Sequence, residues 1–169
     1  LNTDQMLLLY EEIRKAAALT GKETVVDCYS GIGITSLLLA KQAASVVGID
    51  YAEASVKDAK QNALVNRVKN VVFIQDRVEK ALPVLLAKKG VPDVIVFDPP
   101  RTGIDDAVIA EVIKAKAPRL VYVSCNPSTL AKNLHDLEAH YDIAYIQPID
   151  MFPHTAGVES LTLLTRKPA

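Results

Sequence analysis

The chain alternates between short apolar runs rich in β-branched residues and longer segments whose apolar residues recur at helical spacing. The expected strands are residues 23–28, 45–50, 71–74, 93–98, 119–124, 143–148 and 158–165. The expected helices are residues 3–18, 37–43, 52–66, 78–88, 105–114 and 130–139, with Thr3 as the first N-cap and Pro83 as a kink or a break.

Apolar strands separated by helices indicate a parallel sheet that is covered on both faces. The last two strands follow each other without a helix, which predicts an antiparallel addition. We therefore predict an α/β fold with a doubly wound, mostly parallel, seven-stranded sheet of the Rossmann-like type and an antiparallel final strand.

The length of 169 residues fits a single domain covering 1–169, because no Pro/Gly-rich linker divides the chain. We expect this domain to be part of a longer protein, since Leu1 is not an initiator. No apolar run has membrane-spanning length, and no signal segment opens the chain. The two cysteines are too few for a disulfide framework or a tetrahedral metal site, which predicts a cytoplasmic setting without a bound metal.

A glycine turn follows the first expected strand. Gly31 and Gly33 allow a ligand to approach the backbone at a helix N-terminus, and Asp50 ends the next strand, where an acid accepts hydrogen bonds from ribose. A dinucleotide-binding turn has a further glycine where this chain has Ser36. An acid at the end of the first strand, here Asp27, is also more typical of proteins that bind S-adenosylmethionine than of proteins that bind a dinucleotide. The pattern therefore favours S-adenosylmethionine as cofactor.

Asp76 follows the third expected strand. In S-adenosylmethionine proteins this place holds the adenine, whereas an acid here is also a common N-cap for the following helix. The two roles are compatible, and both stay open.

Residues 98–101 read Asp-Pro-Pro-Arg at the end of the fourth helix-flanked strand. The two prolines stiffen the loop and hold Asp98 at the carboxyl edge of the sheet, beside the cofactor crevice. Amino-methyltransferases carry an aromatic residue where this chain has Arg101. Methylation of an exocyclic amine on a nucleic-acid base is therefore the second hypothesis.

Cys125 follows the next strand and precedes a helix, in the sequence Ser-Cys-Asn-Pro. A lone cysteine usually packs as a small core residue. This position is different, because a helix N-terminus stabilises a thiolate and the sheet edge is shared with Asp98. Cys28, beside the glycine loop, is expected to be inert packing.

These motifs, followed by Asp-Met-Phe-Pro-His-Thr at 150–155 and Val-Glu at 158–159, resemble those of the RNA uracil-5-methyltransferase family, which modifies uridines in ribosomal or transfer RNA. The resemblance implies that Cys125 is the nucleophile and Glu159 the base. It also implies cofactor contacts from Tyr29, Asp50 and Asp98. The chain departs from the family pattern at Gly157, where the family commonly has histidine. Asn2 corresponds to the end of a Phe-x-Gln-x-Asn segment whose glutamine precedes this chain.

The implied chemistry begins with addition of the Cys125 thiolate to carbon 6 of uracil, which makes carbon 5 nucleophilic. Glu159 then removes the carbon-5 proton. His154 either assists or is simply a loop histidine.

An RNA substrate, ribosomal RNA first, is the expected partner, although the net charge of −1 leaves no dominant basic footprint. A non-catalytic cofactor- or RNA-binding domain is the third hypothesis.

Overall fold

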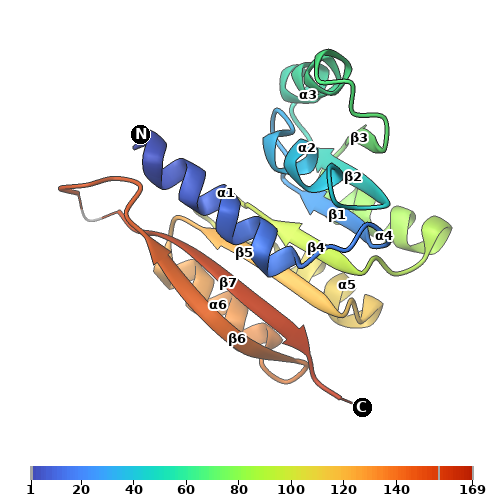
Figure 1. Ribbon diagram of the computed structural model, residues 1–169. Helices are drawn as coiled ribbons and strands as arrows, with labels where there is room; N and C mark the ends of the chain where they lie inside the picture. The colour runs from blue at the N-terminus through green and yellow to red at the C-terminus, as the bar shows by residue number, and fades with distance from the viewer. Residues whose placement is uncertain (1, 156, 169) are drawn as a thin grey trace.

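The computed structural model describes residues 2–155 and 157–168 and contains one seven-stranded sheet flanked by helices (Figure 1). The strands are β1 (Thr24–Cys28), β2 (Ser45–Asp50), β3 (Val71–Gln75), β4 (Val94–Phe97), β5 (Arg119–Ser124), β6 (Tyr141–Ile149) and β7 (Glu159–Arg166). The helices are α1 (Thr3–Ala17), α2 (Ile34–Ala40), α3 (Glu53–Val65), α4 (Val78–Lys89), α5 (Asp106–Ala115) and α6 (Pro127–Leu137).

The strand order is β3-β2-β1-β4-β5-β7-β6. Pairs among the first five strands of this order are parallel, whereas β7 is antiparallel to both β5 and β6. The predicted sheet and its antiparallel final strand are therefore confirmed. The order reverses at β1 and β4, and in open α/β sheets ligands bind outside the carboxyl ends of the strands at such a switch point.

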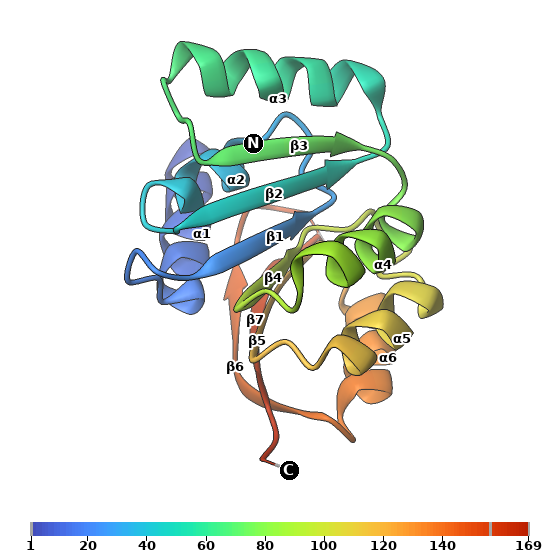
Figure 2. The same ribbon diagram turned by 90° about the vertical axis from the view of Figure 1, so that its right-hand side faces the viewer.

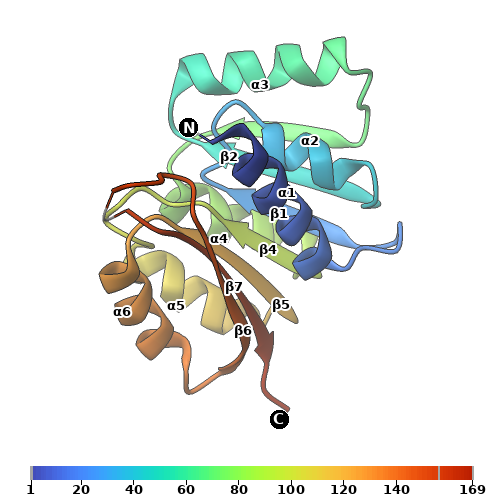
Figure 3. The ribbon, with the colours of Figure 1, turned by 60° about the vertical axis from the view of Figure 1, so that its left-hand side comes forward.

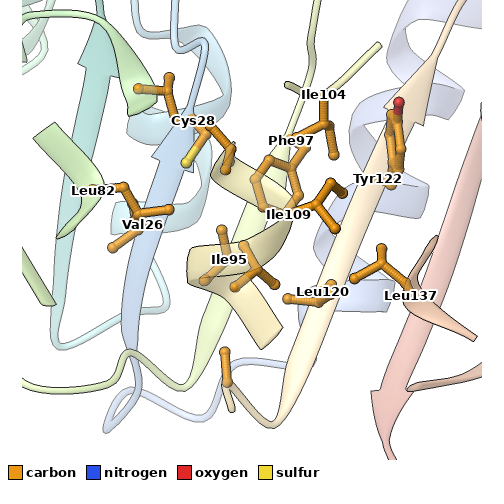
Figure 4. Packing of buried hydrophobic residues seen from close by; sticks show 14 of the residues in the cluster. Val26, Cys28, Leu82, Ile95, Phe97, Ile104, Ile109, Leu120, Tyr122 and Leu137 are labelled. Carbon is orange, nitrogen blue, oxygen red and sulfur yellow. The ribbon is translucent and has the colours of Figure 1, made fainter. Parts of the chain in front are cut away.

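The two faces of the sheet carry separate apolar cores, because successive side chains of a strand point to opposite sides. One core packs β-strand residues such as Val26, Cys28 and Phe97 against α4, α5 and α6 (Figure 4). The other packs Val25 and Val96 against α1 and α2, and α3 covers the β3 end (Figures 2 and 3). Cys28 is fully buried, as expected for inert packing.

Several predicted helix boundaries are wrong. The second helix begins at Ile34, directly after Gly33, rather than at residue 37, and the last begins at Pro127 rather than at residue 130. Asn2, not Thr3, caps α1, since its side chain accepts bonds from the next turn. Pro83 lies inside one uninterrupted helix and does not divide it.

Across the described residues, every helix is too short or too polar to cross a membrane.

Candidate active site

One edge of the sheet gathers the residues that the sequence predicts for the site. Moving across neighbouring strands, they are Asp76 after β3, Asp50 at the end of β2, Tyr29 after β1, Asp98 after β4, Cys125 after β5 and Glu159 at the start of β7. Because β7 runs antiparallel to β5, its first residue reaches the same edge as the last residues of the parallel strands. Six adjacent strands thus each bring one predicted side chain to one edge.

The glycine loop between β1 and α2 has an unusual backbone. Tyr29, Gly31 and Gly33 have φ angles of 65°, 51° and 84°, in the left-handed region that favours glycine. The amide of Gly31 donates to Oδ2 of Asp50 at 2.8 Å, and the amide of Ala52 donates to Oδ1 at 2.9 Å. Both oxygens of Asp50 are therefore oriented by backbone amides, and each keeps a second lone pair for a ligand.

The two loop glycines differ in what surrounds them. A Cβ added at Gly33 would lie 2.7 Å from Cζ of Phe73, whereas one added at Gly31 would meet nothing within 4 Å. We expect Gly33→Ala to lower the free energy of unfolding by about 3 kcal/mol, from backbone strain and overpacking together. Gly31→Ala, the matched control, has only the strain and should cost about 1 kcal/mol. Urea denaturation of both variants measures the difference, and equal losses would contradict this packing.

Asp27 is a buried acid beneath this loop, with 1% of its surface exposed. Its Oδ2 accepts a hydrogen bond from Oγ of Ser36 at 2.5 Å, while its Oδ1 has no partner among the described residues. Burial raises the pKa of Asp27 to about 7, with a smaller rise from the negative charge of Asp98, although the Ser36 bond opposes the shift. Retention of the proton at neutral pH lowers the cost of burying this oxygen without a partner.

The raised pKa predicts how stability varies with pH. The folded protein keeps the Asp27 proton up to about pH 7, whereas the unfolded chain loses it near pH 4. Unfolding releases this proton between those values, so the free energy of unfolding falls as the pH rises through that window, by up to about 1.4 kcal/mol per pH unit. In Asp27→Asn this slope should become clearly shallower. Denaturation at pH 5, 6 and 7 tests it, and an unchanged slope would contradict the assignment.

Asp98 and Glu159 lie on either side of β5, at the same edge. Loss of solvation around the carboxyl raises the pKa of Asp98 to about 6, although the residue as a whole is exposed. Glu159 is buried, and burial followed by the charge of Asp98 raises its pKa to about 7. A carboxyl with a pKa near 7 is suited to act as a general base at neutral pH.

Cys125 is half-buried in a cavity of about 530 Å³. The cavity is lined by Arg101, Cys125, Asn126, Pro127, Phe152, Thr155, Gly157 and Val158. The β5–β7 register pairs Ser124 with Ser160, so Cys125, directly after β5, and Glu159, the first residue of β7, are each one residue in sequence from this pair. Glu159 is buried beside Val158 rather than lining the cavity itself.

Every residue of this lining lies in or beside a motif that the sequence analysis describes, but Phe152 and Thr155 of the β6–β7 loop were not assigned to the site. Asn126 was also missed as the N-cap of α6, where its Oδ1 accepts from the amide of Ser128 at 3.0 Å. An Asn followed by Pro is a helix-start signal that could have found it. His154 is exposed, has a φ of 64°, and is not part of the described lining.

A second cavity, of about 490 Å³, lies towards α4 and α5. It is lined by Tyr29, Tyr51, Arg77, Val78, Glu79, Pro100, residues 102–106 and Lys132. Asp76 is exposed nearby, and its Oδ1 accepts from the amide of Arg77 at 2.8 Å. The N-cap of α4 is Arg77, so the expected capping role of Asp76 is wrong.

Within residues 2–155 and 157–168, no group of three or more His, Cys, Asp or Glu side chains could hold a metal ion.

Comparison with known proteins shows the family to which the chain belongs. The model of the family described as tRNA (Uracil-5-)-methyltransferase matches residues 5–167. The chain belongs to this family. A protein of Halalkalibacterium halodurans named as an uncharacterized RNA methyltransferase is 49% identical over 97% of the chain, and one of Bacillus cereus is 46% identical over 99%. The chain spans about a third of the length of these relatives, 36% in each case.

Solved structures agree with the family and the fold. The tRNA (uracil-54, C5)-methyltransferase of Pyrococcus abyssi, in complex with S-adenosyl-L-homocysteine, matches with a TM-score of 0.79 and 34% identity, covering 92% of this chain and 37% of that one. The N-methyltransferase NodS of Bradyrhizobium japonicum matches with a TM-score of 0.78 at 14% identity, covering 99% of both chains, which shows the fold alone. The family and the fold expected from the sequence are therefore confirmed.

Proposed function

We propose that residues 1–169 form the catalytic domain of an S-adenosylmethionine-dependent RNA methyltransferase that methylates carbon 5 of a uridine. The observation that carries the proposal is that Cys125, directly after β5, and Glu159, the first residue of β7, each follow or precede the Ser124–Ser160 pair in sequence, at the edge that also holds the glycine loop. Family membership supports it, as does the Pyrococcus abyssi enzyme, whose complex contains S-adenosyl-L-homocysteine.

The edge of the sheet that holds the glycine loop, Asp50 and Asp98 is suited to bind a cationic nucleoside. Asp50 and Asp98 supply negative charge there, and Asp27, buried beneath the glycine loop, accepts a hydrogen bond from Ser36 in α2. Asp50, held by two amides, is oriented to accept ribose hydroxyls, and the open space above Gly31 admits a ligand against the backbone. Tyr29, Gly33 and Asp76 complete the proposed cofactor site. When bound, S-adenosylmethionine supplies an electrophilic methyl group.

The residues of this chain activate the uracil. Cys125, as thiolate, adds to carbon 6, and the electrons of the 5,6 double bond move to give an enolate with a nucleophilic carbon 5. Once carbon 5 has received the methyl group, the carboxylate of Glu159 removes the hydrogen that carbon 5 still carries, as a proton. The returning electron pair restores the double bond and expels the Cys125 thiolate.

The substrate is proposed to be RNA, with a uridine of ribosomal RNA as the first candidate and transfer RNA as the second. Arg101 is the cationic side chain in the lining of the Cys125 cavity, and a guanidinium pairs well with phosphate. The second cavity, with Tyr29 and Tyr51, offers aromatic faces close to the cofactor loop. A cytoplasmic setting remains a prediction.

The atom that receives the methyl group can be tested directly. RNA containing uridine tritiated at carbon 5 should release tritium into water in step with methylation by the full-length protein, because substitution at carbon 5 displaces that hydrogen. Methylation without tritium release would contradict the proposal and favour an exocyclic amine. Absence of both methylation and cofactor binding would favour a non-catalytic domain.

A further inference from the structure

The loop that joins β4 to α5 lies against the first turns of α6. Pro99 and Pro100 carry no amide hydrogen, and Gly103 has a φ of 81°. Within the loop, the amide of Gly103 donates to the carbonyl of Pro100 at 2.9 Å, which closes a single turn. The backbone around Arg101 therefore depends on bonds from other elements.

Side chains of α6 and of its N-cap, Asn126, supply these bonds. Nδ2 of Asn126 and Oγ1 of Thr129 both donate to the carbonyl of Arg101, at 3.0 and 3.2 Å. Asn133 bonds Ile104 twice, accepting from its amide at 2.9 Å and donating to its carbonyl at 3.1 Å. Asn126, Thr129 and Asn133 are three and four positions apart, so the N-cap and the two helix residues lie on one face of α6. The loop is thus fastened along the helix that begins after the candidate nucleophile.

The hydroxyl of Thr129 has one proton and two carbonyls within reach, those of Arg101 and Asn126, each at 3.2 Å. The Asn126 carbonyl already accepts from the amide of Leu130 and from Oγ of Ser124, both at 3.1 Å. Those two bonds use its two lone pairs. The Thr129 proton is therefore directed at Arg101, whose carbonyl otherwise accepts from Asn126 alone among the described residues.

We propose that Thr129 is a positioning residue that holds the Arg101 side chain at the Cys125 cavity and thereby sets the affinity for RNA. The inference rests on the proposed function. Thr129 acts through the backbone, because it is not part of the described cavity lining, whereas Arg101 is. A guanidinium held at a fixed place can pair with a phosphate of the bound strand at a smaller entropic cost.

The test compares variants of the full-length protein on unmodified RNA transcripts. Thr129→Val keeps the shape and removes the donor, and we expect the KM for RNA to rise about three- to tenfold, the effect of one hydrogen bond, while kcat changes less than about twofold. Thr129→Ser restores the donor and should recover the wild-type KM. Ser128→Ala, an exposed neighbour, is the control. A wild-type KM in Thr129→Val, or no recovery in Thr129→Ser, would overturn the inference.

A double-mutant cycle shows whether Thr129 acts through Arg101. In an Arg101→Ala background, Thr129→Val should have no further effect on the KM for RNA. An undiminished effect there would mean a general structural role and would overturn the inference.

Two readouts do not need turnover. Titration with RNA should give dissociation constants in the same order as the KM values. The hydrogen-bonded amides of Gly103 and Ile104 should exchange with deuterium at least about threefold faster in Thr129→Val. Unchanged exchange or unchanged RNA affinity would overturn the inference. Suppose that Thr129→Val shows faster exchange and weaker RNA binding, but the wild-type protein forms no 5-methyluridine. This result would support the positioning role of Thr129 and contradict the proposed function.

Discussion

Replacing Cys125 with alanine is expected to abolish methylation, with a loss on the order of 10⁴-fold or more, the scale seen when a catalytic nucleophile is removed. The reason is chemical, because carbon 5 of uracil is a poor nucleophile until a thiolate has added to carbon 6. Cys125 stands in a cavity large enough for a nucleotide, and its loss leaves the cofactor residues in place. Counting methyl groups transferred to RNA measures the effect.

The control is Cys28, which is fully buried in the core below the same edge. Burial raises the pKa of the Cys28 thiol well above its usual value, so it cannot serve as a substitute nucleophile. Cys28→Ala should cost stability but keep the turnover of the folded protein. Cys125→Ala or Cys125→Ser with appreciable turnover would reject the covalent mechanism and restore the exocyclic-amine hypothesis.

The second large effect is expected for Glu159→Gln. Removing a positioned base lowers rates by about 10² to 10⁴-fold. Here the loss should fall on the last step, so the variant should accumulate RNA that is methylated yet still covalently bound to Cys125. Denaturing electrophoresis of the variant with ordinary RNA detects this adduct. Glu138→Gln, at an exposed glutamate that pairs with His135, serves as the control and should form none.

The pH dependence gives an independent check on Glu159. Its pKa is raised to about 7, and only the ionised carboxylate accepts the proton. The methylation rate should therefore rise with pH through about 7 and then level off. Asp98→Asn removes the charge that contributes to the shift, so in this variant the rise should move to lower pH. A profile that is flat from pH 5 to 8 in the wild type would contradict the assignment of Glu159.

Most of the sheet could be predicted from the sequence because its strands are apolar throughout and end in recognisable polar residues. Asp50 ends such a strand, Asp98 and Cys125 each follow one, and parallel strands place their ends at one edge. That topology brings together residues far apart in the chain. To place Glu159 at that edge, the direction of β7 must also be known, because only an antiparallel β7 has its first residue there.

Other features depend on three-dimensional packing and leave little trace in periodicity. The start of α6 was predicted three residues late because Asn126 and Pro127 are polar or ring-constrained and break the apolar pattern, although they form a good helix start. The insertion of β7 between β5 and β6 follows from pairing across the sheet. The bonds from Thr129 and Asn133 to the β4–α5 loop link residues more than 25 positions apart.

The central claim is that Cys125 attacks the uracil ring, and RNA carrying 5-fluorouracil tests it most directly. Fluorine at carbon 5 cannot be removed as a proton, so the covalent species should persist after methyl transfer. With the full-length protein and S-adenosylmethionine, we expect a stable protein–RNA adduct whose mass spectrum places the nucleotide on the peptide that contains Cys125. Absence of an adduct from a protein that methylates ordinary RNA, or an adduct on another residue, would contradict the claim.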